Sequence, residues 1–271
     1  IIPILGNIQD QELLEEIIIK HKINTIYHAA AYKHVPLVEE NIIESVKNNI
    51  VGTRSLLNAA ISNGVDSFTL ISTDKAVKPS NIMGASKKFA ETLCKFYSIE
   101  QSKTSISIVR FGNVLGSSGS VIPLFSNQIE NGGPITVTHK DVRRYFMTIK
   151  EASELVIQAS GMSRSGEIFI LDMGEQVKIL DIATRMARLQ GFTPFIKNSD
   201  QTGDIEIIIT GLRNGEKLRE ELHEGSEIIP TEHPRIISVK ENDKNVSAIN
   251  IEYDELLKAC EDRDRDRIKK L

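Results

Sequence analysis

The residues best suited to chemistry stand together after one apolar run of the sequence. Thr73, Asp74 and Lys75 follow the run 67–72, which ends in Ser72. An acid and a base side by side shift each other's pKa, and both can transfer protons to or from a substrate. A polar turn that caps a helix is the alternative interpretation, because strand-to-helix turns are often polar. The sequence therefore predicts either a proton-transfer group or a capping turn here.

Alternating strands and helices are expected to position these residues. Short apolar, β-branched runs predict parallel strands at residues 23–30, 67–72, 105–111 and 167–171. Helical patterns separate them, at residues 10–21, 39–62, 84–102 and 150–160. This alternation predicts an α/β fold with a doubly wound parallel sheet, in which ligands bind beyond the carboxyl ends of the strands. The polar turn after residue 72 lies at such an end.

Two domains are expected, and the chain crosses between them more than once. The regular alternation loosens after residue 115, where glycine, serine and proline become frequent. We therefore expect a larger sheet domain in residues 1–115 and 149–172, and a smaller α/β domain in residues 116–148 and 173–271. Residues 1–6 have the pattern of a buried strand that ends in a turn, so the chain is expected to begin inside the sheet domain. Within the smaller domain, the charge-dense tail from residue 241 predicts a solvated helix or a frayed end.

Composition narrows the class of protein. The 271 residues are 40% hydrophobic, which is enough for a sizeable core. A net charge of −4 provides no basic surface for nucleic acid. The two distant cysteines indicate neither a disulfide framework nor a metal site, and the histidines do not fall at zinc-ligand spacings. No apolar run reaches roughly 18 residues, so we expect no membrane contact from this segment and a cytoplasmic location.

One stretch of the sequence resembles a known active site. Residues 71–91, ISTDKAVKPSNIMGASKKFAE, are similar to the active-site strand, loop and helix of the polysaccharide-biosynthesis branch of the extended short-chain dehydrogenases. The resemblance implies that the sheet domain is Rossmann-like and binds a dinucleotide, and that the smaller domain binds substrate. Most of the superfamily has a tyrosine where this sequence has Met83. The longer, membrane-associated members have methionine there, and in them Thr73, Asp74 and Lys75 carry more of the chemistry.

The resemblance also implies a bound NAD(P)+ cofactor, with NAD+ favoured. It assigns the cofactor side of the site to Asn7, Ile8, Ala29, Ala30, Ala31, Asn49, Ser72 and Lys87. Packing of three small side chains is the alternative interpretation of the alanines. Two adjacent asparagines are unfavourable inside a helix, which favours a bonding role for Asn49. The glycine loop that normally seats a pyrophosphate on a helix N-terminus is not found before Ile1, so the Rossmann-like sheet is expected to be incomplete at its N-terminal end.

The substrate side of the site is also assigned by resemblance. Its residues are Lys33, Asn113, Val121, Arg213 and Glu216. Residues 211–218, GLRNGEKL, resemble the family's GLRPGEKL motif, which implies that Arg213 pairs with a diphosphate and that Glu216 accepts hydrogen bonds from sugar or ribose hydroxyls. A solvated salt-bridge turn is the alternative interpretation of this motif. Arg143 and Arg144 could also face phosphate.

The implied reaction converts UDP-N-acetylglucosamine to UDP-2-acetamido-2,6-dideoxy-4-keto-hexose in bacterial surface polysaccharide biosynthesis. The cofactor takes a hydride from C4 and returns it at C6 after water has left. We expect Asp74 to protonate the departing hydroxyl, Lys75 to remove the C5 proton and Thr73 to hold O4, with the C5 configuration retained. A sugar-nucleotide 4-epimerase and a noncatalytic sugar-nucleotide binding fragment are the alternatives. A homo-oligomer is implied, and a longer parent protein could lie at the cytoplasmic face of the inner membrane.

Overall fold

The chain divides into two compact units in a computed structural model that describes residues 1–197, 202–225, 227–241 and 246–271. The first unit comprises residues 1–111, 155–172 and 222–271. The second comprises residues 112–154 and 173–221.

The first unit is built on a six-stranded sheet in the order β1-β2-β3-β8-β13-β12. Its strands are β1 (Thr25–His28), β2 (Ser67–Thr73), β3 (Ser105–Phe111), β8 (Glu167–Leu171), β13 (Ile236–Lys240) and β12 (Glu227–Pro230). The first four in this order are parallel to one another, whereas β13 is antiparallel to both β8 and β12. The predicted α/β fold with a parallel-dominated sheet is confirmed, and all four predicted strands are present.

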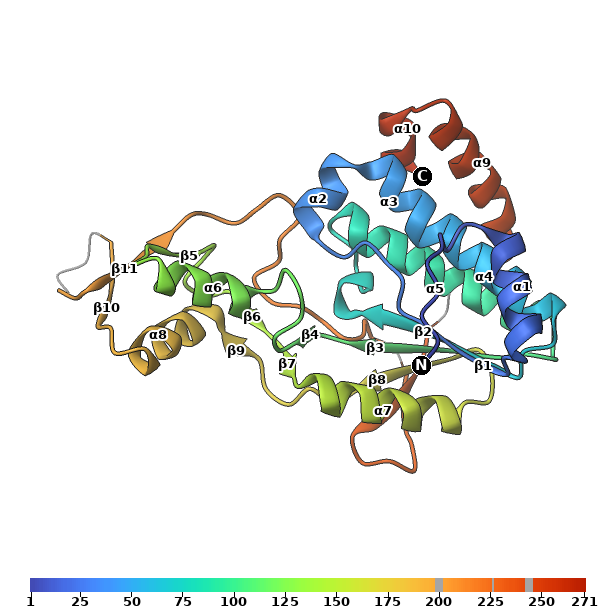
Figure 1. The fold of residues 1–271 in the computed structure, drawn as a ribbon, viewed down its shortest axis with the longest axis horizontal. Helices are drawn as coiled ribbons and strands as arrows, with labels where there is room; N and C mark the ends of the chain where they lie inside the picture. Colours follow the sequence, from blue (N-terminus) through green and yellow to red (C-terminus); the bar gives the residue numbers. More distant parts are fainter. Residues whose placement is uncertain (198–201, 226, 242–245) are drawn as a thin grey trace. The chain divides into compact units, whose positions relative to one another are not determined.

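Helices cover both faces of this sheet (Figure 1). The helices on one face include α3 (Ile42–Val46), α4 (Gly52–Ser62) and α5 (Ile82–Glu100), and α1 (Gln11–His21) packs beside α4. On the other face lies α7 (Ile149–Met162), whose residues from 155 belong to this unit. Side chains alternate along each strand: Phe68 and Leu70 join the core under α3–α5, whereas Thr69 between them donates a hydrogen bond of 2.9 Å to Ser160 of α7.

The helix predicted for residues 39–62 is interrupted. The structure has α2 (Val35–Glu40) and α3, then a π-helical turn, η1 (Lys47–Val51), before α4. The cause is Asn49, whose Oδ1 accepts from Tyr32 N at 2.8 Å and whose Nδ2 donates to Tyr32 O at 3.0 Å. A side chain that bonds a distant backbone in this way favours a widened turn over a regular helix, and such turns are frequent at functional sites.

Two predictions about the ends of the chain are wrong. Residues 1–6 form no strand, and Ile1 and Leu5 are exposed. Residues 222–271 belong to the first unit, not to the smaller one. They contribute β12, β13, η3 (Val246–Ala248), α9 (Ile249–Glu261) and α10 (Arg265–Lys270). The tail is not simply solvated, because the apolar faces of α9 and α10 enter the core through residues such as Tyr253 and Ile268.

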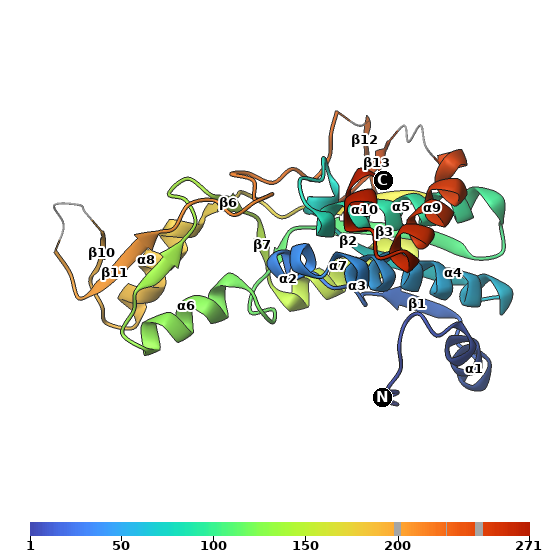
Figure 2. The ribbon, with the colours of Figure 1, turned by 90° about the horizontal axis from the view of Figure 1, so that it is seen from above.

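The second unit has its own smaller core. Its three-stranded parallel sheet has the order β10 (Pro194–Ile196), β11 (Ile205–Ile209), β5 (Ile135–Val137). Two helices pack on this sheet, α6 (Val121–Glu130) and α8 (Ile179–Leu189), and Figure 2 shows α8 beside β10 and β11. Two short pairs complete the unit: β4 (Asn113–Val114) with β7 (Phe146–Met147), and β6 (Arg143–Arg144) with β9 (Val177–Lys178).

Candidate active site

The predicted polar turn after β2 is a bonded group of three side chains. The turn, η2 (Asp74–Ala76), begins where the strand ends. Asp74 Oδ1 accepts from Thr73 Oγ1 at 2.9 Å and from Lys75 Nζ at 3.0 Å. Among the described residues, Asp74 Oδ2 is buried without a hydrogen-bond partner. The Asp74 side chain is fully buried and that of Lys75 is 20% exposed, so Lys75 is the more accessible of the pair.

The first turn of α5 packs tightly on this turn. A Cβ at Gly84 would overlap the carbonyl oxygen of Lys75. Asn81 caps the helix by accepting from Gly84 N at 2.9 Å, and Glu39 accepts from Ile82 N at 2.7 Å. Met83 is buried in the same turn. The helix start and the polar turn are therefore held as one piece.

Lys87 lies on α5 and reaches β2. It is 6% exposed, and its Nζ donates to Ile71 O at 2.6 Å. Burial lowers the pKa of Lys87 to about 8, and the nearby Glu91 and Cys94 oppose that shift. Lys87 therefore keeps its positive charge at neutral pH inside a largely dry site. The ammonium of Lys87 is thus bonded to Ile71 of β2, two residues before Thr73.

A buried cluster next to Lys87 was not predicted from the sequence. Glu91 accepts from Ser72 Oγ at 2.6 Å, and Arg110 Nε and Nη2 donate to its two carboxylate oxygens at 2.7 and 2.6 Å. Both Glu91 and Arg110 are fully buried. The spacing of Glu91, four positions after Lys87 on a predicted helix, was the available signal, because such residues share one face.

The loop after β1 is joined to the first turn of α5 through Asn49. Asn49 is 1% exposed, and besides binding Tyr32 its Nδ2 donates to Ser86 Oγ at 3.0 Å. Ala29 and Ala30 in this loop are exposed and Ala31 is half-buried, so the three alanines do not pack in the core. Asn49 thus bridges the loop after β1 and α5.

His28 precedes these alanines at the end of β1. Thr53 Oγ1 donates to Asn49 O at 2.7 Å and lies 2.8 Å from His28 Nε2, so Nε2 must be the donor in that contact. Burial, helped by the charge of Lys87, lowers the pKa of His28 to about 3. His28 is therefore neutral, with its proton on Nε2.

The other predicted cofactor residues lie near the start of the chain. Asn7 is exposed, and its Oδ1 accepts from Gln9 N at 3.0 Å. Ile8 is half-buried and packs against the core of the first unit, where its side chain meets Gly52. Lys33, predicted to face substrate, is exposed in the loop after β1.

The remaining substrate-side residues belong to the second unit. Asn113 lies in β4 and Val121 begins α6. Arg213 is exposed, and its backbone N–H donates to Glu216 Oε2 at 3.1 Å. Glu216 Oε1 accepts from Thr138 Oγ1 at 2.9 Å and Arg144 Nη2 at 3.2 Å. Within this unit Glu216 is thus ion-paired with Arg144 of β6, which lies outside the GLRNGEKL motif.

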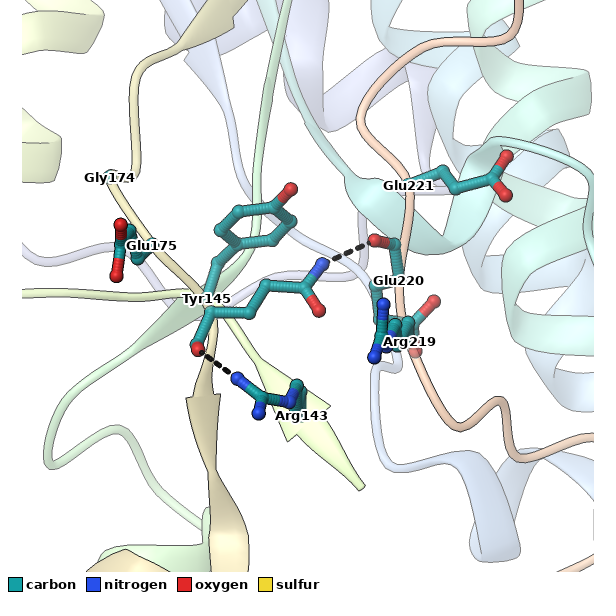
Figure 3. Close-up of a pocket in the computed structure, with 8 residues that line it drawn as sticks. Arg143, Tyr145, Gly174, Glu175, Arg219, Glu220 and Glu221 are labelled. Atoms are coloured by element: carbon teal, nitrogen blue, oxygen red, sulfur yellow. Dashed lines mark hydrogen bonds between the residues drawn. The ribbon is translucent and has the colours of Figure 1, made fainter. Parts of the chain in front are cut away.

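A hollow of about 600 Å³ lies within the second unit (Figure 3). It is lined by Arg143, Tyr145, Gly174, Glu175, Gln176, Arg219, Glu220 and Glu221. Gln176 crosses part of it. Its side-chain Nε2 donates to the backbone oxygen of Glu220 at 2.6 Å, and its backbone oxygen accepts from Arg143 Nη1 at 3.4 Å. Among the lining residues only Arg143 was singled out from the sequence. The lining combines two guanidinium groups, which are planar donors for an anion, with three glutamates.

The part of the chain that the structure describes has neither a metal-binding cluster nor a membrane-spanning helix. No three histidine, cysteine, aspartate or glutamate side chains gather there as a metal site would need. No helix in that same part is both long and apolar enough to cross a bilayer.

Known proteins share much of this sequence. A family model described as "Polysaccharide biosynthesis protein" matches residues 1–241. The chain is 50% identical over 229 residues to the capsular polysaccharide biosynthesis protein CapD of Staphylococcus aureus, which covers 84% of the chain and 37% of CapD. It is 35% identical over 226 residues to a UDP-glucose 4-epimerase of Rickettsia rickettsii, which covers 83% of the chain and 62% of the epimerase. The chain thus spans less than two thirds of either relative.

Solved structures share the fold. The dTDP-glucose 4,6-dehydratase DesIV from Streptomyces venezuelae, with NAD and TYD bound, matches with a TM-score of 0.68 and 21% identity, over 81% of this chain and 70% of DesIV. The matched family model covers residues 1–241, which is most of the sequence. The chain therefore belongs to the polysaccharide biosynthesis protein family, within the extended short-chain dehydrogenases.

Proposed function

We propose that the chain dehydrates a nucleotide sugar, converting UDP-N-acetylglucosamine to UDP-2-acetamido-2,6-dideoxy-4-keto-hexose. The observation that carries the proposal is the bonded group of Thr73, Asp74 and Lys75 at the end of β2, with Lys87 docked on the same strand. An acid, a base and a buried cation thus occupy the edge of the sheet where doubly wound folds bind ligands.

The residues at this edge fit a nicotinamide dinucleotide. Ala29 and Ala30, directly after β1, are exposed and have no bulky side chains, so a flat ligand can approach their backbone. The residues proposed to hold NAD(P)+, with NAD+ favoured, are Asn7, Ile8, Ala29, Ala30, Ala31, Asn49, Ser72 and Lys87. When bound, this cofactor supplies the hydride acceptor for C4 and the hydride donor for C6. The ammonium of Lys87 stabilises negative charge beside the reacting carbon.

Asp74 is the proposed acid for the departing C6 hydroxyl. Its Oδ1 is occupied by Thr73 and Lys75, which leaves the partnerless Oδ2 as the atom for a transferable proton. The side chain is closed to solvent, so this role requires the turn to open when the sugar binds.

Lys75 is the proposed base that removes the C5 proton. It is the member of the pair that a substrate reaches directly, since its side chain is partly exposed. Thr73 holds O4 in this scheme. Met83 has no group that can exchange a proton, so proton transfer rests on the turn alone, and we infer that the C5 configuration is retained.

The nucleotide end of the substrate is assigned to the second unit. Arg213 is exposed there, and a guanidinium fork matches phosphate oxygens. Arg143 and Arg219 in the hollow are further candidates for the diphosphate. Lys33, Asn113 and Val121 are assigned to the sugar side. Glu216 already accepts several hydrogen bonds, but each carboxylate oxygen has a second lone pair for a hydroxyl.

A 4-epimerase is the second candidate, favoured by the 35% identity to a protein named UDP-glucose 4-epimerase. Mass spectrometry separates the two reactions. We expect the intact protein with UDP-N-acetylglucosamine and NAD+ to give a product lighter by one water. A product of unchanged mass, the 4-epimer, would refute the dehydratase proposal. No product, together with retained sugar nucleotide, would favour a binding fragment.

A further inference from the structure

The buried cluster around Glu91 contacts β2 directly before the residues of the proposed active site. Lys87 and Glu91 are one helical turn apart on α5 and bind consecutive residues of β2: Lys87 Nζ donates to Ile71 O, and Glu91 accepts from Ser72 Oγ. The next residue of the strand is Thr73. Side chains from two successive turns of α5 thus bind β2 directly before Thr73.

Arg110 holds Glu91 from the opposite side. It is the next-to-last residue of β3, in register with Ser72, and it binds both carboxylate oxygens of Glu91. Bidentate pairs of this kind are directional as well as strong. Because both groups are fully buried, neither can move without exposing an unpaired charge to an apolar surrounding.

Glu241, the residue directly after β13, is also part of the cluster. Glu241 accepts from Arg110 Nη1 and Nη2, and from Lys88 Nζ at 2.8 Å. Lys88 Nζ also lies 3.9 Å from Glu91 Oε2, and Lys95 Nζ lies 3.9 Å from Glu241 Oε2. Both carboxylates thus lie near more than one cation, and of the two Glu241 is the more exposed, with its side chain 12% exposed against 1% for Glu91.

We propose that Glu91, oriented by Arg110, is a positioning residue that holds the end of β2 through Ser72 and supplies the negative charge one helical turn from Lys87. The charged and titratable groups that face Lys87 are His28 from β1, and Glu91 and Cys94 from α5. His28 is neutral and burial raises the pKa of the Cys94 thiol. Glu91 is therefore the negative charge that offsets the cost of burying the ammonium. The inference rests on the proposed function only where it places the cofactor on Lys87.

A titration of Lys87 tests the inference without any substrate. The intact protein is labelled with ¹³Cε-lysine, and the Lys87 resonance is identified by its loss in Lys87→Arg. We expect an inflection near pH 8 in the parent protein and one lower by roughly 1 unit in Glu91→Gln, because an opposite charge has been removed. Glu100→Gln, an exposed glutamate at the end of α5, is the matched control and is expected to leave the inflection unchanged.

Two more variants keep the test decisive. Glu241→Gln leaves the Glu91–Arg110 pair intact and is expected to leave the Lys87 inflection unchanged; equal shifts in Glu241→Gln and Glu91→Gln would overturn the assignment to Glu91. If Glu91→Gln does not fold, Glu91→Gln/Arg110→Gln removes both buried charges together, and its Lys87 inflection is also expected to fall. A Lys87 inflection that stays near pH 8 in a folded variant without the Glu91 carboxylate contradicts the inference. Absence of dehydratase turnover in the parent protein, with the titration as expected, would refute the proposed function alone.

Discussion

The backbone of Gly84 packs directly against the carbonyl oxygen of Lys75, so closely that a Cβ at position 84 would overlap it. The contact joins the first turn of α5 to the turn that carries Asp74 and Lys75. Helix and turn can therefore keep their spacing only with glycine at this position, because a backbone oxygen cannot swing aside as the end of a side chain can.

Gly84→Ala is accordingly expected to displace the polar turn. Overpacking should lower the free energy of unfolding by about 1–3 kcal/mol, and turnover should fall more than nucleotide binding. Denaturant unfolding and steady-state kinetics measure both effects. Gly161→Ala is the control, because a Cβ at that helical position meets nothing within 4 Å. It should be neutral or stabilising by up to about 1 kcal/mol; equal losses in both variants would argue against the contact.

Asp74→Asn and Lys75→Ala are each expected to reduce turnover by about 10²–10⁴-fold, the usual contribution of a proton-transfer group. Cofactor content should stay near the parent value, since neither residue is assigned to the dinucleotide. Turnover and NAD content by absorbance are the measurements. Lys103→Ala, an exposed lysine in the loop before β3, is the control and should remain fully active. Near-normal turnover in either turn variant would remove that residue from the mechanism.

His28 is expected to make stability depend on pH. Its pKa of about 3 in the folded chain lies below the ordinary histidine pKa of 6.5, so between these two pH values the unfolded chain binds a proton that the folded chain does not. Stability from this group is present above pH 6.5 and is lost as pH falls towards 3, at up to about 1.4 kcal/mol per pH unit. Denaturant unfolding at pH 7, 6 and 5 should show a steeper fall for the parent than for His28→Gln, whereas exposed His34→Gln should follow the parent. Parallel curves for the parent and His28→Gln would contradict a buried neutral His28.

Arg143→Ala is expected to weaken UDP binding by about tenfold or more, because a charge-assisted hydrogen bond contributes about 1.5–3 kcal/mol. Titration calorimetry with UDP measures the effect without turnover. The control is Arg188→Ala, on the exposed side of α8 in the same unit. Unchanged UDP affinity in Arg143→Ala would exclude the hollow from nucleotide binding.

The strand ends that carry Thr73, Asp74 and Lys75 were predictable, because β-branched apolar runs and the polar residues after them are local signals. The π-helical turn was not, since it depends on Asn49 bonding Tyr32, a contact 17 residues away in the sequence. The return of residues 222–271 to the first sheet was missed for a similar reason. Strand β13 pairs with β8 across more than 60 residues, and no local pattern encodes that pairing.

The buried cluster of Glu91 and Arg110 was also not predictable from local sequence patterns. In the sequence, Glu91 and Arg110 are each expected to be exposed, because charged residues are seldom fully buried unless they are paired. Only the register of β2 with β3 brings Arg110 beside Ser72, and only α5 brings Glu91 to both. Their burial follows from tertiary pairing rather than from composition or periodicity.

Proton NMR of the product formed by the intact protein from UDP-N-acetylglucosamine and NAD+ tests the central claim most directly. The account predicts a C6 methyl signal, a 4-keto sugar and retained configuration at C5. A product that keeps its C6 hydroxymethyl group and is inverted at C4 would contradict dehydration. A methyl-bearing product inverted at C5 would contradict the assignment of proton transfer to Lys75 without a part for Met83.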